Sequence, residues 1–195
     1  MPIDKSHPWG EVVSLTTDVP VFRSEAELSF VLSPSGPSEA RMSGGDFVEV
    51  TGGTSANDRE VRRYVSDVLE VRADDLSWWT VGTVEARSRR WRMLGGFVVA
   101  SNLGQLAGER YSTRTHPNDG KFEVVDALDG LSTRERLKLI RRLATGGDIS
   151  HPRVRQRQID TYHAPRPLHL FVDGHYRGRH SVMITLHPDA LVVYV

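Results

Sequence analysis

The chain contains no cysteine. Disulfides, thiolate metal sites and thiol nucleophiles are therefore excluded. Lysine is scarce as well: it occurs only at positions 5, 121 and 138, so nearly all the basic residues are arginine. Arginine suits carboxylates and phosphates because its planar guanidinium donates two parallel hydrogen bonds, but a general arginine bias of the genome explains the same composition.

Long apolar runs are also missing, and residues 1–10 are polar and interrupted by proline, unlike a signal peptide. Acidic and basic residues number 25 each, so the net charge is zero and gives no reason to expect nucleic-acid binding. Among 195 residues, 38% are hydrophobic and 26% are charged, which is typical of a folded chain. We expect a single, cytoplasmic domain without a transmembrane segment or a nucleic-acid partner.

Most of the sequence alternates apolar and polar residues with a period of two, which predicts short strands bounded by turns. The expected strands are residues 10–16, 26–32, 46–51, 64–72, 79–87, 96–102, 121–128 and 168–173. Residues 181–186 and 190–195 are expected to form a hairpin around His187-Pro188-Asp189. Residues 33–45 are expected to form a long mobile loop.

One segment has a helical pattern. Ser132 and Glu135 have the spacing of a capping box, in which each side chain binds the other residue's amide. The apolar residues that then share one helix face are Leu137, Ile140, Leu143 and Ala144. A second short helix is expected to start at 55–58 and cover 58–63. The expected fold is therefore mostly β, a β-sandwich with one prominent inserted helix.

Two turns carry polar residues that could bind or react. Asn118-Asp119-Gly120 precedes a strand, and Asp173-Gly174-His175 follows one. Both patterns are typical of ordinary tight turns. Asp173 or His175 could instead act as a general base, since carboxylates and imidazoles at strand ends often serve that role.

Arginines are clustered in three places: Arg87, Arg89, Arg90 and Arg92 around Trp91; the outer face of the predicted helix; and Arg153, Arg155 and Arg157. Such clusters are usually solvated surface. The alternative is contact with anionic lipid headgroups or phosphate.

Metal and phosphate sites have weak support. Seven histidines occupy the second half of the chain, but no pair has the spacing of a zinc motif, so no metal is expected. Gly44-Gly45-Asp46 could present backbone amides to a phosphate, although a hairpin loop explains the same residues.

The second half of the sequence has an ordered set of motifs. Residues 96–102 (GFVVASN) are followed by a polar loop, then by Asn118-Asp119-Gly120 and a strand, a helix, Val172-Asp173-Gly174, and the closing residues 182–195 (VMITLHPDALVVYV). This order resembles the C-terminal β-sandwich domain of the bacterial diacylglycerol kinase and sphingosine kinase-like lipid kinases, over residues 65–195. Asp119 corresponds to the family's Asp-Gly position, and Asn102 corresponds to its strand-end asparagine.

The resemblance implies an active site between this domain and an N-terminal nucleotide-binding domain with a GGDGT loop. Here Gly44-Gly45-Asp46 continues as Phe47-Val48, and the residues before it are too few for a nucleotide-binding domain. The family's Asp-Gly-Glu motif, whose glutamate serves as the base, has His175 in place of the glutamate.

We therefore expect a stand-alone, lipid-kinase-like pseudoenzyme that binds a lipid, a phosphorylated ligand or a partner protein. One alternative is a lipid phosphotransferase that obtains its nucleotide-binding domain, with ATP and Mg²⁺, from a separate chain; the other is a structural module that dimerises through open sheet edges. No cofactor is expected in the chain itself. The ligand-binding candidates are Asn102, Asn118, Asp119, Asp173 and His175. Asp119 and His175 are also the catalytic candidates, expected within about 10 Å of each other.

Overall fold

The computed structural model describes residues 10–15, 18–53, 60–91, 95–106, 109–110, 116–128, 130–144, 151–164 and 166–195. The strands are β1 (Glu11–Ser14), β2 (Val21–Phe22), β3 (Glu39–Met42), β4 (Glu60–Ala73), β5 (Leu76–Thr80), β6 (Thr83–Arg87), β7 (Phe97–Ser101), β8 (Gln105–Leu106), β9 (Glu109–Arg110), β10 (Phe122–Ala127), β11 (Arg155–Ile159), β12 (Thr161–His163), β13 (Leu168–Val172), β14 (His175–His180) and β15 (Met183–Tyr194). The helices are α1 (Glu25–Ser29), α2 (Asp46–Thr51) and α3 (Thr133–Ala144).

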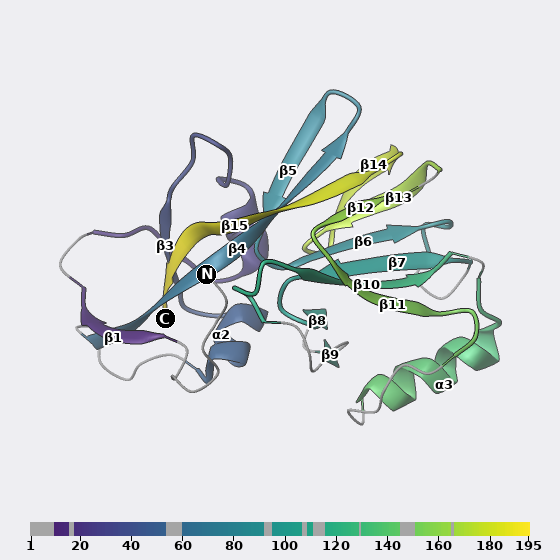
Figure 1. The fold of residues 1–195 in the computed structure, drawn as a ribbon, viewed down its shortest axis with the longest axis horizontal. Helices are drawn as coiled ribbons and strands as arrows, with labels where there is room; N and C mark the ends of the chain where they lie inside the picture. Colours follow the sequence, from purple (N-terminus) through teal and green to yellow (C-terminus); the bar gives the residue numbers. More distant parts are fainter. Residues whose placement is uncertain are drawn as a thin grey trace.

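These strands form two main sheets, which lie side by side in Figure 1. The first sheet has the order β1-β4-β15-β3-β2, with β5 paired to β4 and β12 paired to β15. The second sheet has the order β11-β10-β7-β6-β13-β14 and is antiparallel throughout. The long strands β4 and β15 pair with each other and extend across to the second sheet. The expected mostly-β fold is confirmed.

The main core lies between the two sheets. Leu69 and Val71 of β4 and Ile184 of β15 pack against side chains such as Val98 and Val124 of the second sheet. A second apolar cluster places α1 and α2 on the first sheet through Leu28 and Phe47, both fully buried. The helix α3 covers part of the outer face of the second sheet.

The prominent helix α3 begins as its sequence predicts. The Ser132 amide donates to the Glu135 carboxylate at 2.8 Å, and the Glu135 amide donates to the Ser132 hydroxyl at 3.3 Å. Its buried face differs from the prediction, because Leu137 is 43% exposed whereas Leu139 and Arg136 are buried. Arg136 stacks on Phe97, so the sheet side of the helix includes a cation. The side chains of the other predicted core residues, Ile140, Leu143 and Ala144, lie outside the described part of the chain.

Two predicted strands are helices. Residues 26–32 contribute to α1, where the Ser24 hydroxyl accepts from the Glu27 amide at 3.3 Å as an N-cap. Residues 46–51 form α2 although they are rich in β-branched residues. The Glu25 carboxylate accepts from the Phe47 amide at 2.7 Å and so caps α2 from another element, while Gly52 ends it in the left-handed conformation. This tertiary cap outweighs the local β propensity.

Four other predictions are wrong in detail. The segment 33–45 contains β3, which pairs with β15 in parallel. Residues 79–87 contribute to two separate strands, β5 and β6, and residues 60–63 are strand rather than helix, while 55–58 lie outside the described residues. Finally, residues 183–194 form one continuous strand, β15, instead of a hairpin. The register shift between His187 and Leu191 is a bulge, in which the Asp189 amide binds a carboxylate of β4 instead of turning the chain back.

Candidate functional site

All five predicted site residues lie where strands of the second sheet begin or end, on the same side of that sheet. We call this row of strand ends the sheet edge. Asn102 follows the end of β7, Asn118 and Asp119 precede β10, Asp173 follows β13, and His175 begins β14. Because neighbouring strands are antiparallel, the end of β7 and the start of β10 meet at the same edge as the turn between β13 and β14. The structure therefore gathers these residues along an edge, and their individual contacts decide what they can do.

The centre of this edge is a carboxylate that the sequence analysis missed. Asp67 of β4 is almost fully buried, and its two oxygens accept from the amides of Gly120 and Asp189, each at 2.9 Å. Burial raises the pKa of Asp67 above its ordinary value, although both amides favour the ionised form. One side chain thus fastens the turn before β10 and the bulge of β15 to the first sheet.

The two predicted asparagines reinforce this connection. The Asn102 side-chain amide donates to the carbonyls of Asp67 at 2.9 Å and Pro117 at 3.3 Å. The Asn118 side-chain amide donates to the Val65 carbonyl at 2.9 Å and to the Asp189 carboxylate at 2.8 Å. Because both neighbours of the Asn102 amide are carbonyls, its orientation is fixed, and its own buried oxygen accepts no hydrogen bond from the described residues. Both asparagines therefore join the two sheets.

Asp119 is exposed, and its carboxylate makes a separate hydrogen bond while its charge adds to the raised pKa of Asp67. Its carboxylate accepts from the Lys121 amide at 3.0 Å, which closes a short turn on the surface. Loss of hydration raises the pKa of Asp119 in spite of that amide and of the nearby His116. Burial lowers the pKa of His116, so its ring favours the neutral form. Asp119 and His116 are the polar pair that the turn keeps near the surface.

At the other end of the sheet edge, the hydrogen bonds of Asp173 join separate parts of the chain. Its carboxylate accepts from the Thr80 hydroxyl at 2.6 Å and from the Thr83 amide at 2.9 Å, which ties the turn after β13 to the start of β6. Burial raises the pKa of Asp173 to about 6 despite these donors. Glu25 lies nearby, and burial raises its pKa as well, with a smaller repulsion from Asp173. Asp173 is thus one of two neighbouring carboxyls with raised pKa values.

His175 is exposed and contacts neither Asp119 nor its partners among the described residues. Its Nδ1 lies 3.1 Å from the Asp173 carbonyl oxygen, and its ring meets the edge of Phe30 at 5.3 Å between centroids. Four strand spacings of about 4.8 Å separate β10 from β14, which places the two backbones on the order of 19 Å apart along the sheet. The prediction that Asp119 and His175 approach within about 10 Å does not fit this order.

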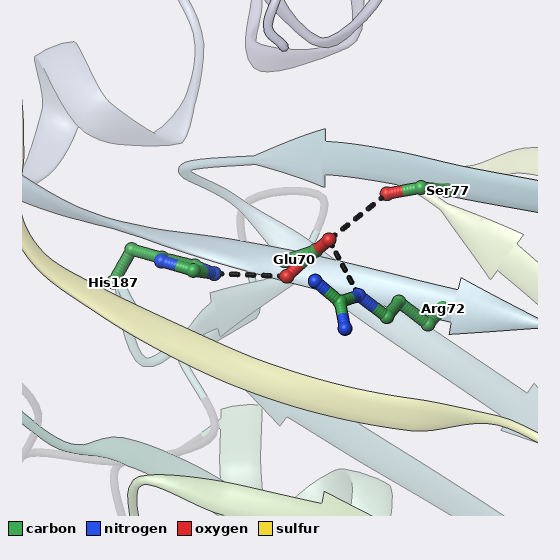
Figure 2. Close-up of polar contacts among 4 residues, drawn as sticks. All are labelled: Glu70, Arg72, Ser77 and His187. Atoms are coloured by element: carbon green, nitrogen blue, oxygen red, sulfur yellow. Dashed lines mark hydrogen bonds and ion pairs between the residues drawn. The ribbon is translucent and has the colours of Figure 1, made fainter. Parts of the chain in front are cut away.

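A further polar cluster, also missed from the sequence, lies on the first sheet (Figure 2). Glu70 is buried and its carboxylate binds the His187 ring at 2.9 Å, Arg72 at 2.7 Å and the Ser77 hydroxyl at 3.3 Å. Burial disfavours its ionised form, but the hydrogen bonds from Arg72 and His187 outweigh burial and hold the pKa of Glu70 below its usual range. The indole of Trp79 lies 4.6 Å from the His187 ring. These contacts tie β4 to β5 and β15.

The predicted phosphate turn is already occupied by a protein group. Gly44-Gly45-Asp46 leads into α2, whose Phe47 amide is bound by Glu25. A side chain at Gly45 would collide with the Glu25 carboxylate, so the two elements are in close contact. The turn therefore does not present a free set of amides to a phosphate. Among the residues that the structure describes, no cluster of three or more acidic or histidine side chains could hold a metal ion.

No protein-family profile and no curated protein sequence matches the chain. Solved structures do. A protein described as a "putative diacylglycerol kinase" from Bacillus anthracis str. Sterne superposes with a TM-score of 0.60 at 10% sequence identity, covering 83% of this chain and 69% of that one. A second solved structure, described as diacylglycerol kinases from the same organism, superposes with a TM-score of 0.55 at 9% sequence identity, covering 82% of this chain and 67% of that one.

The fold is diacylglycerol-kinase-like. This likeness confirms the fold that the ordered motifs predict, namely a mostly-β chain with the architecture of bacterial lipid kinases. At 9–10% identity it extends to the fold and not to the reaction. Within the diacylglycerol-kinase-like fold, none of the described helices is long and apolar enough to cross a membrane.

Proposed function

We propose that this chain is a non-catalytic, lipid-kinase-like domain that binds a lipid or a phosphorylated ligand. The main support for this proposal is that most of the candidate side chains bind other parts of the chain. Asn102 and Asn118 donate their side-chain amides to other parts of the chain, and Asp173 accepts from Thr80 and Thr83. Three of the five candidate side chains are thus engaged in holding strand ends together.

The other two candidate residues are badly placed for joint catalysis. Transfer of a phosphoryl group to a lipid hydroxyl requires a base within hydrogen-bonding reach of that hydroxyl and charge stabilisation at the same point. Asp119 and His175 lie before β10 and at the start of β14, with β7, β6 and β13 between these strands. His175 also stands where the lipid kinases have their glutamate base. Both facts favour binding over phosphoryl transfer.

The ligand class rests on the fold. The similar solved structures are described as diacylglycerol kinases, so a diacylglycerol-type lipid or its phosphorylated product is the first ligand to test. Such a ligand offers hydroxyl or phosphate groups that Asp119, His116 or His175 could bind at the sheet edge.

The experiment has two readouts on the full chain. The first is mass spectrometry of the native protein for lipids and phosphorylated molecules that co-purify with it, and we expect a bound molecule. The second is phosphorylation of diacylglycerol with ATP and Mg²⁺, with and without a separately expressed nucleotide-binding domain that carries a GGDGT loop. We expect no phosphorylated lipid, including from the variant His175→Glu, which restores the family's glutamate.

The outcomes separate the three classes of function. Phosphorylated lipid in the mixed reaction would overturn the proposal and favour a two-chain phosphotransferase. Absence of both a bound molecule and a product would also overturn it and favour a structural module. Sedimentation velocity would then test for a dimer formed through the unpaired side of an outermost strand such as β14.

A further inference from the structure

The outer face of the second sheet is only half covered. Phe97 and Val99 of β7 and Val125 of β10 pack against Leu139 of α3 on that face. No described helix covers the other half, formed by β6, β13 and β14. There, alternate residues of β13 point outward, because Leu168, Leu170 and Val172 point into the core.

This open half presents arginines and aromatic rings together. His169 lies opposite Arg179, and Phe171 lies opposite Tyr176. The residues that follow β6 bring more of the same chemistry, because Arg90 stacks on the Tyr176 ring at 4.9 Å. We call the following residues the arginine–aromatic face: Arg90, Phe171, Tyr176 and Arg179, together with the exposed Trp91 that directly follows Arg90 in the chain.

The base of this face is rigid and electrically neutral. Arg87 lies 4.0 Å above the Phe171 ring, and its guanidinium binds both oxygens of Glu85, at 2.6 and 2.5 Å. This ion pair neutralises the charge of Glu85, which is the acidic residue opposite Phe171 on β6. Tyr176 is held from the side by His169, whose Nδ1 lies 3.1 Å from the tyrosine hydroxyl. The Phe171 and Tyr176 rings therefore have defined positions before any partner arrives.

The outer layer carries uncompensated positive charge and exposed rings. Arg90 and Arg179 are exposed, and within the described part of the chain no acidic side chain forms an ion pair with either. Trp91 is 78% exposed and Tyr176 is 41% exposed. Indole and phenol rings are favoured where an apolar medium meets water, and arginine binds phosphate with its planar fork. Since the net charge of the chain is zero, attraction to an anionic surface must be local to such a face.

We propose that the arginine–aromatic face docks on a membrane surface that contains anionic phospholipids. Arg90 and Arg179 bind headgroup phosphates, while Trp91 and Tyr176 enter the interfacial layer. This inference rests on the proposed lipid function and adds where and how the domain meets its lipid. It assigns a role to Arg90, a member of the arginine cluster around Trp91, which the sheet-edge residues leave unexplained.

The test is co-sedimentation of the full chain with two kinds of vesicle, one of phosphatidylcholine alone and one that also contains phosphatidylglycerol. We expect binding to the anionic vesicles that weakens with added salt.

Arg90→Gln and Arg179→Gln should each weaken vesicle binding about fivefold, and the double variant about 25-fold. The matched control is Arg62→Gln, an exposed arginine of β4 in the first sheet, which should leave binding within about twofold of the original. Trp91→Ala should weaken binding more than Leu76→Ala, which removes an exposed apolar side chain from β5.

Three results would overturn the inference: no binding of the original chain to anionic vesicles, unchanged binding by the double variant, or an equal loss in Arg62→Gln. If the face binds an acidic protein but the chain does not bind anionic vesicles, the inference is overturned as well. The proposed function is judged separately by co-purified lipid. If lipid co-purifies but vesicles do not bind, the docking face is wrong and the proposed function stands. If vesicle binding depends on Arg90 and Arg179 and no ligand co-purifies, the docking face stands and the bound-ligand proposal fails.

Discussion

Replacement of Asp67 by alanine should be among the most damaging single polar changes in this fold. The carboxylate accepts from the amides of Gly120 and Asp189, and the residue is only 1% exposed. Its removal leaves two part-buried donors without their acceptor. An unsatisfied buried donor costs about 1–3 kcal/mol, so Asp67→Ala should lower the free energy of unfolding by about 2–6 kcal/mol, and partial burial favours the lower half of that range.

The assay is urea unfolding followed by tryptophan fluorescence, with Asp119→Ala as the matched control. Asp119 lies in the same turn, but its bond to the Lys121 amide is exposed, so its loss should cost less than about 1 kcal/mol. Asp67→Asn, which keeps one acceptor, should fall between the two. The reasoning is refuted if Asp119→Ala costs as much as Asp67→Ala, or if Asp67→Ala costs under about 0.5 kcal/mol.

Other measurements test separate parts of the structure. The pKa of Asp173 is raised to about 6, so the folded chain holds a proton that the unfolded chain releases. The contribution of Asp173 to stability should therefore be fully present below about pH 3.8 and be lost, by up to about 3 kcal/mol, as the pH rises through about 6, and Asp173→Asn should reduce this pH dependence in urea melts from pH 3 to pH 8. Leu139→Ala should cost about 2–5 kcal/mol whereas exposed Leu137→Ala should cost under about 1, and equal costs would mean that α3 docks differently. ATP with Mg²⁺ should leave the melting temperature unchanged in a thermal-shift assay; a stabilisation near 2.7 kcal/mol, expected at a hundredfold the Kd, would contradict this.

The sequence predicts the elements whose signals are local. The apolar run of β7, the alternation in β10 and β13, and the Ser132–Glu135 capping box all appear where they are expected. The sequence of α1 carries a similar signal, since Ser24 and Glu27 have the same spacing, although residues 26–32 also alternate as a strand does. A capping pattern therefore deserves priority over a short alternating run.

The missed elements depend on distant partners. The start of α2 is capped by Glu25, 22 residues before Phe47, and the bulge in β15 depends on Asp67, 122 residues before Asp189. No window of the sequence contains both members of such a pair. The same limit applies to the site. Asp67 and Glu70 in the apolar run of β4 are visible signals of buried carboxylates that need donors.

The contacts at the sheet edge give several of the candidate residues a structural role that does not depend on any reaction. Asn102, Asn118 and Asp173 bind the chain itself, so replacing any of them would loosen the junction between strands whether or not a substrate is ever bound. Stability alone is a sufficient reason to keep them. Asp119 and His175 make only surface contacts, and it is at His175 that the chain departs from the lipid-kinase pattern. A match at the first three residues therefore reports on the fold, and only the last two report on chemistry.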